Sequence, residues 1–138
     1  MILLDTSGLL AALDSDQRHH RQAAASLIDA TPPLLLSPFV LAELDYMLLS
    51  RVGAAARASL LEEVERDAYL LETMTGADVA RAYKIIKRHA DLGISLADAS
   101  IIVLAERHRV RDVLTLDERH FRVLTANGKP FRLLPADA

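Results

Sequence analysis

The chain has 138 residues, 51% of them hydrophobic, and no cysteine, which excludes disulfide bonds and thiolate metal sites. Its net charge of −3, from 16 basic and 19 acidic side chains, argues mildly against a nucleic-acid binder, whose surface usually carries a basic surplus. No apolar run approaches the roughly 18 residues of a membrane span, and no basic segment precedes the first apolar run as in a signal peptide. We therefore expect a single cytoplasmic domain over residues 1–138.

Short apolar strands alternate with helices along the chain. Apolar runs predict strands buried on both faces over residues 1–4, 34–36, 68–72, 112–115 and 131–134. Helices are expected over residues 9–13, 18–30, 38–52, 54–66, 75–91 and 95–108, with a turn at 127–128. Because strands separated by helices give crossover connections, we expect an α/β fold with a parallel sheet.

An acid follows the first strand directly, in the segment MILLDTSG. Asp5 is therefore expected at the carboxyl end of a buried strand, where open α/β sheets bind ligands at the point at which strand order reverses. Ser7 and Gly8 predict the start of a helix, with the Ser7 hydroxyl as its cap.

Glu43 is the next acid that stands out, because its helical neighbours are apolar or aromatic. Phe39 and Val40 precede it by four and three residues, and Tyr46 and Met47 follow it by three and four. A buried carboxylate without a partner is costly, so this position favours a cation nearby. The alternative is a Glu at the rim of the core, with its carboxylate in solvent.

Asp98 shares the apolar stripe of its helix with Ile101, Ile102 and Ala105. The segment from Ser95 to Asp98 also matches a capping box, in which the acid sits in the first turn and stabilises the helix start. Both interpretations stay open, because an acid in the first turn that points inward would lie near the same edge of the sheet as Asp5.

Asp117 lies directly beyond the fourth predicted strand, a position equivalent to that of Asp5. If the first and fourth strands are neighbours, these two acids face each other. The alternative is a helix cap for the short turn that ends at Phe121. Asp14 and Asp16 are expected to be solvated. The five histidines show no zinc-type spacing, and no phosphate-binding glycine loop or serine-nucleophile motif is present.

Four segments in this order resemble a known family: LLDTSGL, LLLSPFVLAELDYML, GISLADASIIVLAER and VLTLDERHF. Together they resemble the PIN-domain family, and within it the VapC-type ribonuclease toxins of type II toxin–antitoxin pairs, over nearly the whole chain. The resemblance implies a three-layer α/β/α sandwich around a parallel sheet of strand order 3-2-1-4-5. The family's acids fall on Asp5, Glu43, Asp98 and Asp117, and its accompanying hydroxyl on Thr115, with Thr6 and Ser7 beside the first acid.

Four neighbouring carboxylates cannot all stay ionised without a cation, and oxygen ligands favour a hard ion such as Mg²⁺ or Mn²⁺. Such an ion orients the attacking water and stabilises the leaving oxygen, so we expect metal-dependent hydrolysis of RNA. Asp5 and Asp98 are the first candidates for direct or water-mediated metal ligands. Glu43 is expected to bind the ion or one of its waters, and Asp117 a second ion. Thr115 is expected to position water or a carboxylate.

RNA also needs cations near an acidic site. Excluding four acids in a metal site leaves 15 acidic against 16 basic side chains, a balance of +1. We predict substrate contacts from Arg119 and Arg122, close to Asp117 in sequence, and from Arg88 on a basic helical surface. A solvated helix face is the alternative for each. The other basic candidates are Arg81, Lys84 and Lys87 on the same helical surface as Arg88, and a second cluster of Arg107, Arg109 and Arg111.

The resemblance also implies a homodimer and a VapB-like antitoxin that lays a helix in an apolar groove. Leu41, Leu44, Leu48, Leu49 and residues 54–61 are candidates for that groove, with plain core packing as the alternative. The main rival function is a non-catalytic PIN-like module that binds RNA or a protein. A phosphatase is disfavoured because no lysine follows a predicted strand, and a DNA nuclease of similar fold stays open.

Overall fold

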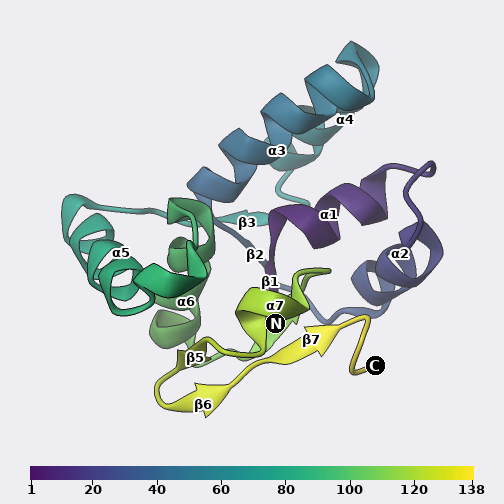
Figure 1. Ribbon diagram of the computed structural model, residues 1–138. Coiled ribbons are helices and arrows are strands. Elements are labelled where there is room, and N and C mark those ends of the chain that lie inside the picture. Colours follow the sequence, from purple (N-terminus) through teal and green to yellow (C-terminus); the bar gives the residue numbers. More distant parts are fainter.

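The computed structural model describes residues 1–138, which form a five-stranded parallel sheet with helices on both sides (Figure 1). The sheet has the order β3-β2-β1-β4-β7, and every neighbouring pair is parallel. Its strands are β1 (Ile2–Leu4), β2 (Leu34–Leu36), β3 (Leu70–Leu71), β4 (Asp112–Leu114) and β7 (Arg132–Leu134). This confirms the expected three-layer sandwich of order 3-2-1-4-5, with β7 as the fifth strand.

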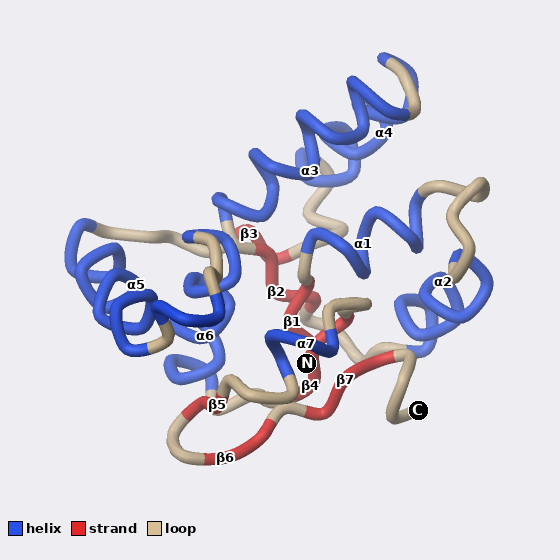
Figure 2. Tube along the Cα trace, in the orientation of Figure 1, coloured by secondary structure: helices blue, strands red, loops and turns tan.

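The helices lie in pairs around this sheet (Figure 2). One side carries α1 (Thr6–Leu13) and α2 (His20–Asp29), and the other carries α5 (Gly76–Arg88) and α6 (Leu96–His108). The pair formed by α3 (Pro38–Arg51) and α4 (Ala54–Glu65) extends away from the strands. No helix combines the length and apolar character that crossing a membrane would require.

Two short elements complete the chain between β4 and β7. The first is α7 (Glu118–Phe121), and the second is an antiparallel hairpin of β5 (Thr125–Ala126) and β6 (Lys129–Pro130). The hairpin closes through the expected turn at Asn127 and Gly128, both of which have positive φ. Its two-residue strands are too short to show an alternating pattern, so the sequence did not predict them.

The boundary of the first helix differs from the expectation. Helix α1 begins at Thr6, and Asp5 is its N-cap residue, so the predicted capping role of Ser7 is wrong. The Ser7 hydroxyl donates instead to the Asp5 carboxylate. The helix predicted over residues 75–91 also ends earlier, at Arg88, and a 3-10 turn (Ala90–Leu92) leads to Gly93 in the left-handed conformation.

A row of apolar side chains crosses the middle of the sheet. Leu3 pairs in register with Leu35 on one side and Val113 on the other, and Val113 pairs with Leu133. All four side chains are fully buried. Covering the sheet on both faces explains why its strands are continuous apolar runs rather than alternating ones. The core therefore fixes β1 and β4 as neighbours, which places Asp5 near Thr115.

Gly8 allows α1 to lie directly against the end of β4. A Cβ atom at Gly8 would lie 2.3 Å from the carbonyl oxygen of Leu114 and 2.8 Å from the backbone nitrogen of Thr115. Neither backbone atom can move aside without displacing β4 in the sheet. Glycine is therefore required for this approach.

Gly8→Ala is expected to lower the free energy of unfolding by about 1–3 kcal/mol, because the methyl group overlaps the β4 backbone. Urea denaturation of the variant and the native chain measures this loss. Gly76→Ala is the matched control, because nothing lies within 4 Å of its added Cβ. The control is expected to change stability by less than about 1 kcal/mol. Equal stabilities of the Gly8 variant and the native chain would contradict the close approach.

Candidate active site

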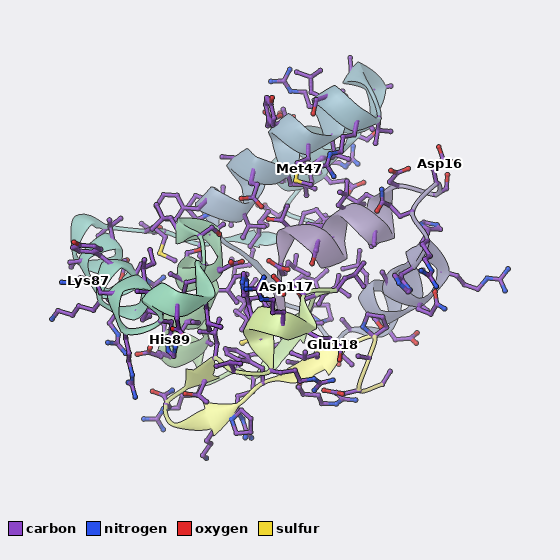
Figure 3. The ribbon with its side chains drawn as sticks, in the orientation of Figure 1. Asp16, Met47, Lys87, His89, Asp117 and Glu118 are labelled. Atoms are coloured by element: carbon purple, nitrogen blue, oxygen red, sulfur yellow. The ribbon has the colours of Figure 1, made fainter.

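A cavity of about 330 Å³ opens where β1 and β4 end, and only one of its ten lining residues is hydrophobic. It brings together Asp5 after β1, Glu43 on α3, Asp98 on α6 and Asp117 before α7. Figure 3 shows Asp117 near the middle of the molecule and Met47 on α3, and both residues line the cavity. The remaining lining residues are Thr6, Ser7, Gly93, Ser95 and His120. The four acids that the sequence singled out thus share one cavity.

Asp5 is the most deeply buried of these acids, with 4% of its surface exposed. One carboxylate oxygen, Oδ2, accepts hydrogen bonds from the hydroxyls of Thr115 (2.7 Å) and Ser7 (2.7 Å). Burial, with a smaller contribution from the negative charge of Asp98, raises the Asp5 pKa from 3.8 to about 6, although the two hydroxyl bonds act in the opposite direction. At neutral pH the carboxylate is therefore mostly ionised, and its burial favours a cation beside it.

The hydroxyls of Thr115 and Ser7 connect the ends of the two central strands. Thr115 Oγ1 accepts the backbone N–H of Asp117 (2.9 Å), and Ser7 Oγ accepts that of Leu116 (3.0 Å). The two hydroxyl oxygens are 3.2 Å apart. Thr115 thus holds the Asp5 carboxylate and the backbone of Asp117 together.

Asp98 belongs to a capping box and also lines the cavity. Its Oδ2 accepts the backbone N–H of Ser95 (3.1 Å), and its own N–H donates to the Ser95 hydroxyl (3.0 Å). The two alternatives left open by the sequence therefore hold at the same time. The capping bonds fix the rotamer of Asp98 with its carboxylate at the cavity wall.

Asp117 likewise caps a helix while it faces the cavity. Its Oδ1 accepts the backbone N–H of His120 (3.1 Å) at the start of α7, and its Oδ2 lies 2.9 Å from Nδ1 of the same histidine. The capping interpretation and the site interpretation again apply to one side chain. Its second oxygen stays available to the cavity.

Glu43 departs from the expectation of a carboxylate buried on an apolar stripe. The structure leaves it exposed, and Tyr46, one turn later, is 71% exposed. The reason is that α3 extends beyond the sheet, so this face of the helix meets the cavity and solvent rather than the core. Glu43 therefore lies at the open rim, as the alternative interpretation had it.

His120 was missed as a candidate because histidines were judged by zinc-type spacing. Its Nδ1 lies 2.9 Å from Oδ2 of Asp117 and 3.4 Å from Oδ2 of Asp98. The three side chains present ligand atoms that all lie within 4.8 Å of one another. The signal available in the sequence was the three-residue spacing from Asp117, which places both side chains on one helical turn.

Two buried side-chain atoms of the chain lack a hydrogen bond, Thr6 Oγ1 and His120 Nδ1, and both belong to residues that line this cavity. Buried polar atoms are normally satisfied, so orphaned ones indicate a polar occupant. Carboxylate oxygens are the ligands that Mg²⁺ and Mn²⁺ prefer. The lining therefore fits a divalent cation with its waters.

The predicted substrate-binding arginines differ in whether their guanidinium groups are already held in ion pairs. Arg122 donates to both Glu118 (2.9 Å) and Asp137 (2.7 Å), so its guanidinium is held by two carboxylates and the structure does not favour it as a substrate contact. Arg119 and Arg88 are exposed and form no ion pair. Arg122 was chosen from sequence proximity alone, which cannot show a partner 15 residues away.

The expectation for Asp14 was also wrong. Asp14 is buried, with 8% of its surface exposed, and accepts hydrogen bonds from the Asp16 backbone (3.1 Å) and the Gln17 amide (3.1 Å). It closes the turn between α1 and α2 rather than lying in solvent. Asp16 is exposed as expected.

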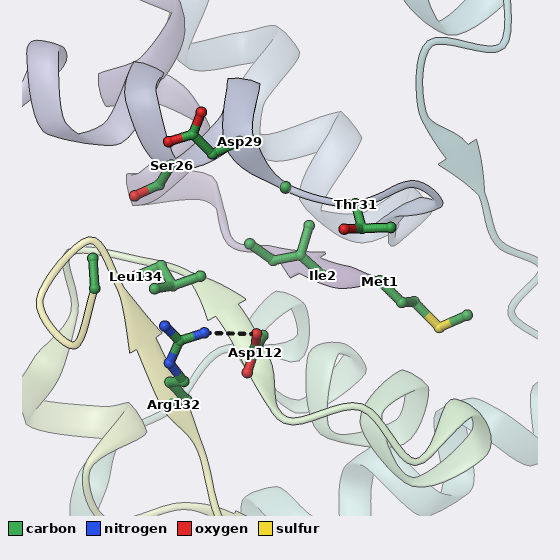
Figure 4. A pocket seen from close by; sticks show the side chains of 10 residues that line it. Met1, Ile2, Ser26, Asp29, Thr31, Asp112, Arg132 and Leu134 are labelled. Carbon is green, nitrogen blue, oxygen red and sulfur yellow. Dashed lines mark hydrogen bonds and ion pairs between the residues drawn. The ribbon is translucent and has the colours of Figure 1, made fainter.

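A second cavity, of about 360 Å³, lies at the opposite edge of the sheet, where β1 and β4 begin (Figure 4). Its central charges are already paired, because Arg132 donates to Asp112 (3.1 Å). Met1, Ile2 and Leu134 supply apolar walls. This cavity gathers no cluster of acids and lies at the amino ends of the strands, away from the edge where α/β sheets bind ligands.

Comparison with known proteins identifies a family and a curated relative that this chain is similar to. The PIN domain family matches residues 2–125. Ribonuclease VapC26 of Mycobacterium tuberculosis (strain ATCC 25618 / H37Rv) is 37% identical over 135 residues, which cover 97% of this chain and all of that protein.

Two solved structures share the fold. VapC20 of Mycobacterium tuberculosis, described as a toxin that cleaves the sarcin–ricin loop, superposes with a TM-score of 0.80 at 21% identity, over 85% of this chain and 90% of that one. FitAcB from Neisseria gonorrhoeae superposes with a TM-score of 0.52 at 24% identity, over 79% and 83%. At these identities the superpositions show a common fold.

In a buffer that contains a metal chelator, the free energy of unfolding is expected to fall as the pH rises from about 4 to about 6. In this interval folded Asp5 keeps its proton while the unfolded chain loses it, so the folded state binds more protons and rising pH favours unfolding. The shift corresponds to about 3 kcal/mol at most. Urea denaturation at a series of pH values measures the effect.

Asp5→Asn is expected to remove this component of the pH dependence, because an amide does not ionise. Asp45→Asn is the control: Asp45 pairs with Arg57 on α4 and lies outside the cavity. Identical pH profiles for the native chain and the Asp5 variant would refute the buried ionisation.

Proposed function

The chain belongs to the PIN-domain family of VapC-type ribonucleases, and from this we propose that it is a metal-dependent endoribonuclease, the toxin of a type II toxin–antitoxin pair. The resemblance noted in the sequence is thereby confirmed at the level of the family. The observation that carries the proposal is the convergence of Asp5, Glu43, Asp98 and Asp117 on one cavity at the carboxyl edge of the sheet. As hydrolysis of RNA is the proposed activity, the proposed place of action is the cytoplasm.

The proposed ligands of a divalent ion are Asp5, Asp98 and Asp117, with Glu43 holding the ion or one of its waters from the open rim. Such an ion supplies charge for the scissile phosphate and activates water. Mg²⁺ or Mn²⁺ is proposed because the acids offer oxygen ligands. Hydrolysis places the oxygen of water on phosphorus and the proton on the departing 3′ oxygen, which leaves a 5′-phosphate and a 3′-hydroxyl.

The side chains of this chain have separate parts in that reaction. Thr115 and Ser7 hold Asp5 in one orientation, because both hydroxyls donate to the same oxygen. The capping bonds of Asp98 and Asp117 keep those carboxylates at the wall. Glu43 is exposed and forms no ion pair, so it can approach substrate or water at the rim.

Partner binding is proposed for the α3–α4 pair. Leu44 and Leu48 are fully buried, so for these two the alternative of core packing holds. Leu49 is 42% exposed. The α3–α4 helix pair also presents an apolar surface suited to an antitoxin helix or a second copy of the chain. Its other exposed apolar side chains are Tyr46, Val52 and Leu61. We propose a VapB-like antitoxin and a homodimer on this basis.

The rival function is a non-catalytic PIN-like module that binds RNA or protein. Such a module needs no ion, so it gives no reason to keep four carboxylates in one cavity at the electrostatic cost seen for Asp5. The intact set of acids therefore favours the enzyme. Incubation of the purified chain with total RNA, with Mg²⁺ or with a chelator, separates the two functions.

Asp5→Asn and Glu43→Gln are each expected to lower the rate of Mg²⁺-dependent RNA cleavage by at least about 100-fold, because each removes a proposed metal or water ligand. The fold is expected to persist, as judged by circular dichroism. Asp45→Asn, two residues from Glu43 on α3 and outside the cavity, is the matched control and should cleave at the native rate. Undiminished cleavage by the two site variants would overturn the assignment.

Arg119→Gln is expected to weaken RNA cleavage several-fold and to reduce the slope of log rate against log salt by about 1, because one phosphate contact is lost. Arg122→Gln is the comparison, since its guanidinium is held by Glu118 and Asp137. It should leave the salt slope unchanged. The opposite ranking of the two variants would show that the ion pairs of Arg122 open to admit RNA.

A further inference from the structure

The imidazole of His120 is fixed at one nitrogen and unsatisfied at the other. Its Nε2 donates to the backbone carbonyl of Leu92 (3.0 Å) in the connection between α5 and α6. A nitrogen that donates there carries the proton of the neutral ring, so Nδ1 keeps its lone pair. The backbone contact thereby selects the tautomer that presents a bare nitrogen to the cavity.

That bare nitrogen faces two carboxylates and makes no hydrogen bond. Nδ1 lies 2.9 Å from Oδ2 of Asp117 and 3.4 Å from Oδ2 of Asp98, is fully buried and has no hydrogen-bond partner. A lone pair against two negatively charged oxygens is repulsive unless a cation lies among the three atoms. A protonated Nδ1 would lie at ion-pair distance from both oxygens, but neither contact has hydrogen-bond geometry, so its N–H would be a buried donor without a well-directed acceptor.

The separations suit ligands of one ion. Two ligand atoms about 2.1 Å from a six-coordinate ion, at right angles to each other, lie about 3 Å apart. The two measured distances from Nδ1 are close to this value. Metal-binding histidines also characteristically donate their other ring N–H to a backbone carbonyl or a carboxylate, and Leu92 supplies such a carbonyl.

A second orphaned atom lies in the same cavity. Thr6, with 4% of its surface exposed, leaves its Oγ1 without a hydrogen bond, and it is part of the same lining. A cation with bound water would give this hydroxyl a partner as well as Nδ1. The two orphaned atoms thus point to the same kind of occupant from two separate elements, α1 and α7.

We propose that His120 binds the divalent ion of this site through Nδ1 and that this nitrogen makes the site prefer Mn²⁺ to Mg²⁺. Imidazole is a ligand of transition ions, whereas Mg²⁺ prefers oxygen, so one nitrogen among carboxylates shifts the preference between the two ions. This inference rests on the proposed function, and it adds a ligand and a selectivity that four acids alone do not supply.

The direct test is pulsed electron paramagnetic resonance on the native chain loaded with Mn²⁺. A coordinated imidazole gives a nitrogen coupling to the electron spin, and labelling the chain with ¹⁵N-histidine changes the isotope seen in that coupling. The expected result is one histidine nitrogen bound to Mn²⁺. This measurement needs no variant and no activity assay.

His120→Asn assigns the nitrogen to its residue, because the Asn Oδ1 occupies nearly the place of Nδ1 and replaces nitrogen by oxygen. Titration calorimetry is expected to show Mn²⁺ affinity lowered by about tenfold or more, with Mg²⁺ affinity changed far less, and the nitrogen coupling lost. His19→Asn is the matched control, because His19 is exposed and lies outside the cavity. It should keep the native affinities and coupling.

The outcomes separate this inference from the proposed function. If the native chain binds Mn²⁺ without a nitrogen coupling, or the coupling persists in His120→Asn, the histidine ligand is refuted while a nuclease based on carboxylates stands. If the native chain binds neither Mn²⁺ nor Mg²⁺, the metal-dependent function fails together with the inference.

Discussion

The buried carboxylate of Asp5 is the constraint on which this structure depends. Two hydroxyls satisfy one of its oxygens, yet burial still raises its pKa to about 6. The fold accepts this cost because the core row across β1 and β4 and the close approach at Gly8 hold Asp5 against the cavity at the ends of these strands, with only 4% of its surface exposed. A cation in the cavity offsets the cost of burying the charged carboxylate, and without a cation a bound proton removes that cost at low pH.

Asp98 and Asp117 are held in place by hydrogen bonds that cap the amino ends of helices. Asp98 completes the capping box of α6, whose N-cap is Ser95, and Asp117 is the N-cap of α7, so each carboxylate has its rotamer fixed by a backbone N–H of its own segment. Capping and ligand binding need not compete, since a carboxylate has two oxygens and about four acceptor positions. Preorganisation of this kind keeps a site in place without help from a ligand.

Local signals in the sequence predicted local structure, and contacts between distant segments explain the failures. The apolar run before Asp5 predicted a buried strand, and the capping box from Ser95 to Asp98 was found as expected. The strand order and the convergence of the acids came from the family resemblance, because spacing alone does not show which strands are neighbours. The ion pair of Arg122 with Asp137 and the contact of His120 with Leu92 join residues 15 and 28 positions apart, which no periodicity reveals.

Helices α1 and α6 both begin at this cavity, and their orientation bears on why the acids tolerate one another. Helix α1 follows Asp5, and α6 carries Asp98 in its first turn, so the positive ends of both helix dipoles face the carboxylates. Each dipole end is equivalent to about half a charge, less than the several negative charges gathered there. The Asp5 pKa is raised even so, first by burial and to a lesser degree by the charge of Asp98. The cavity thus keeps a negative electrostatic potential, and this potential favours the binding of a divalent cation.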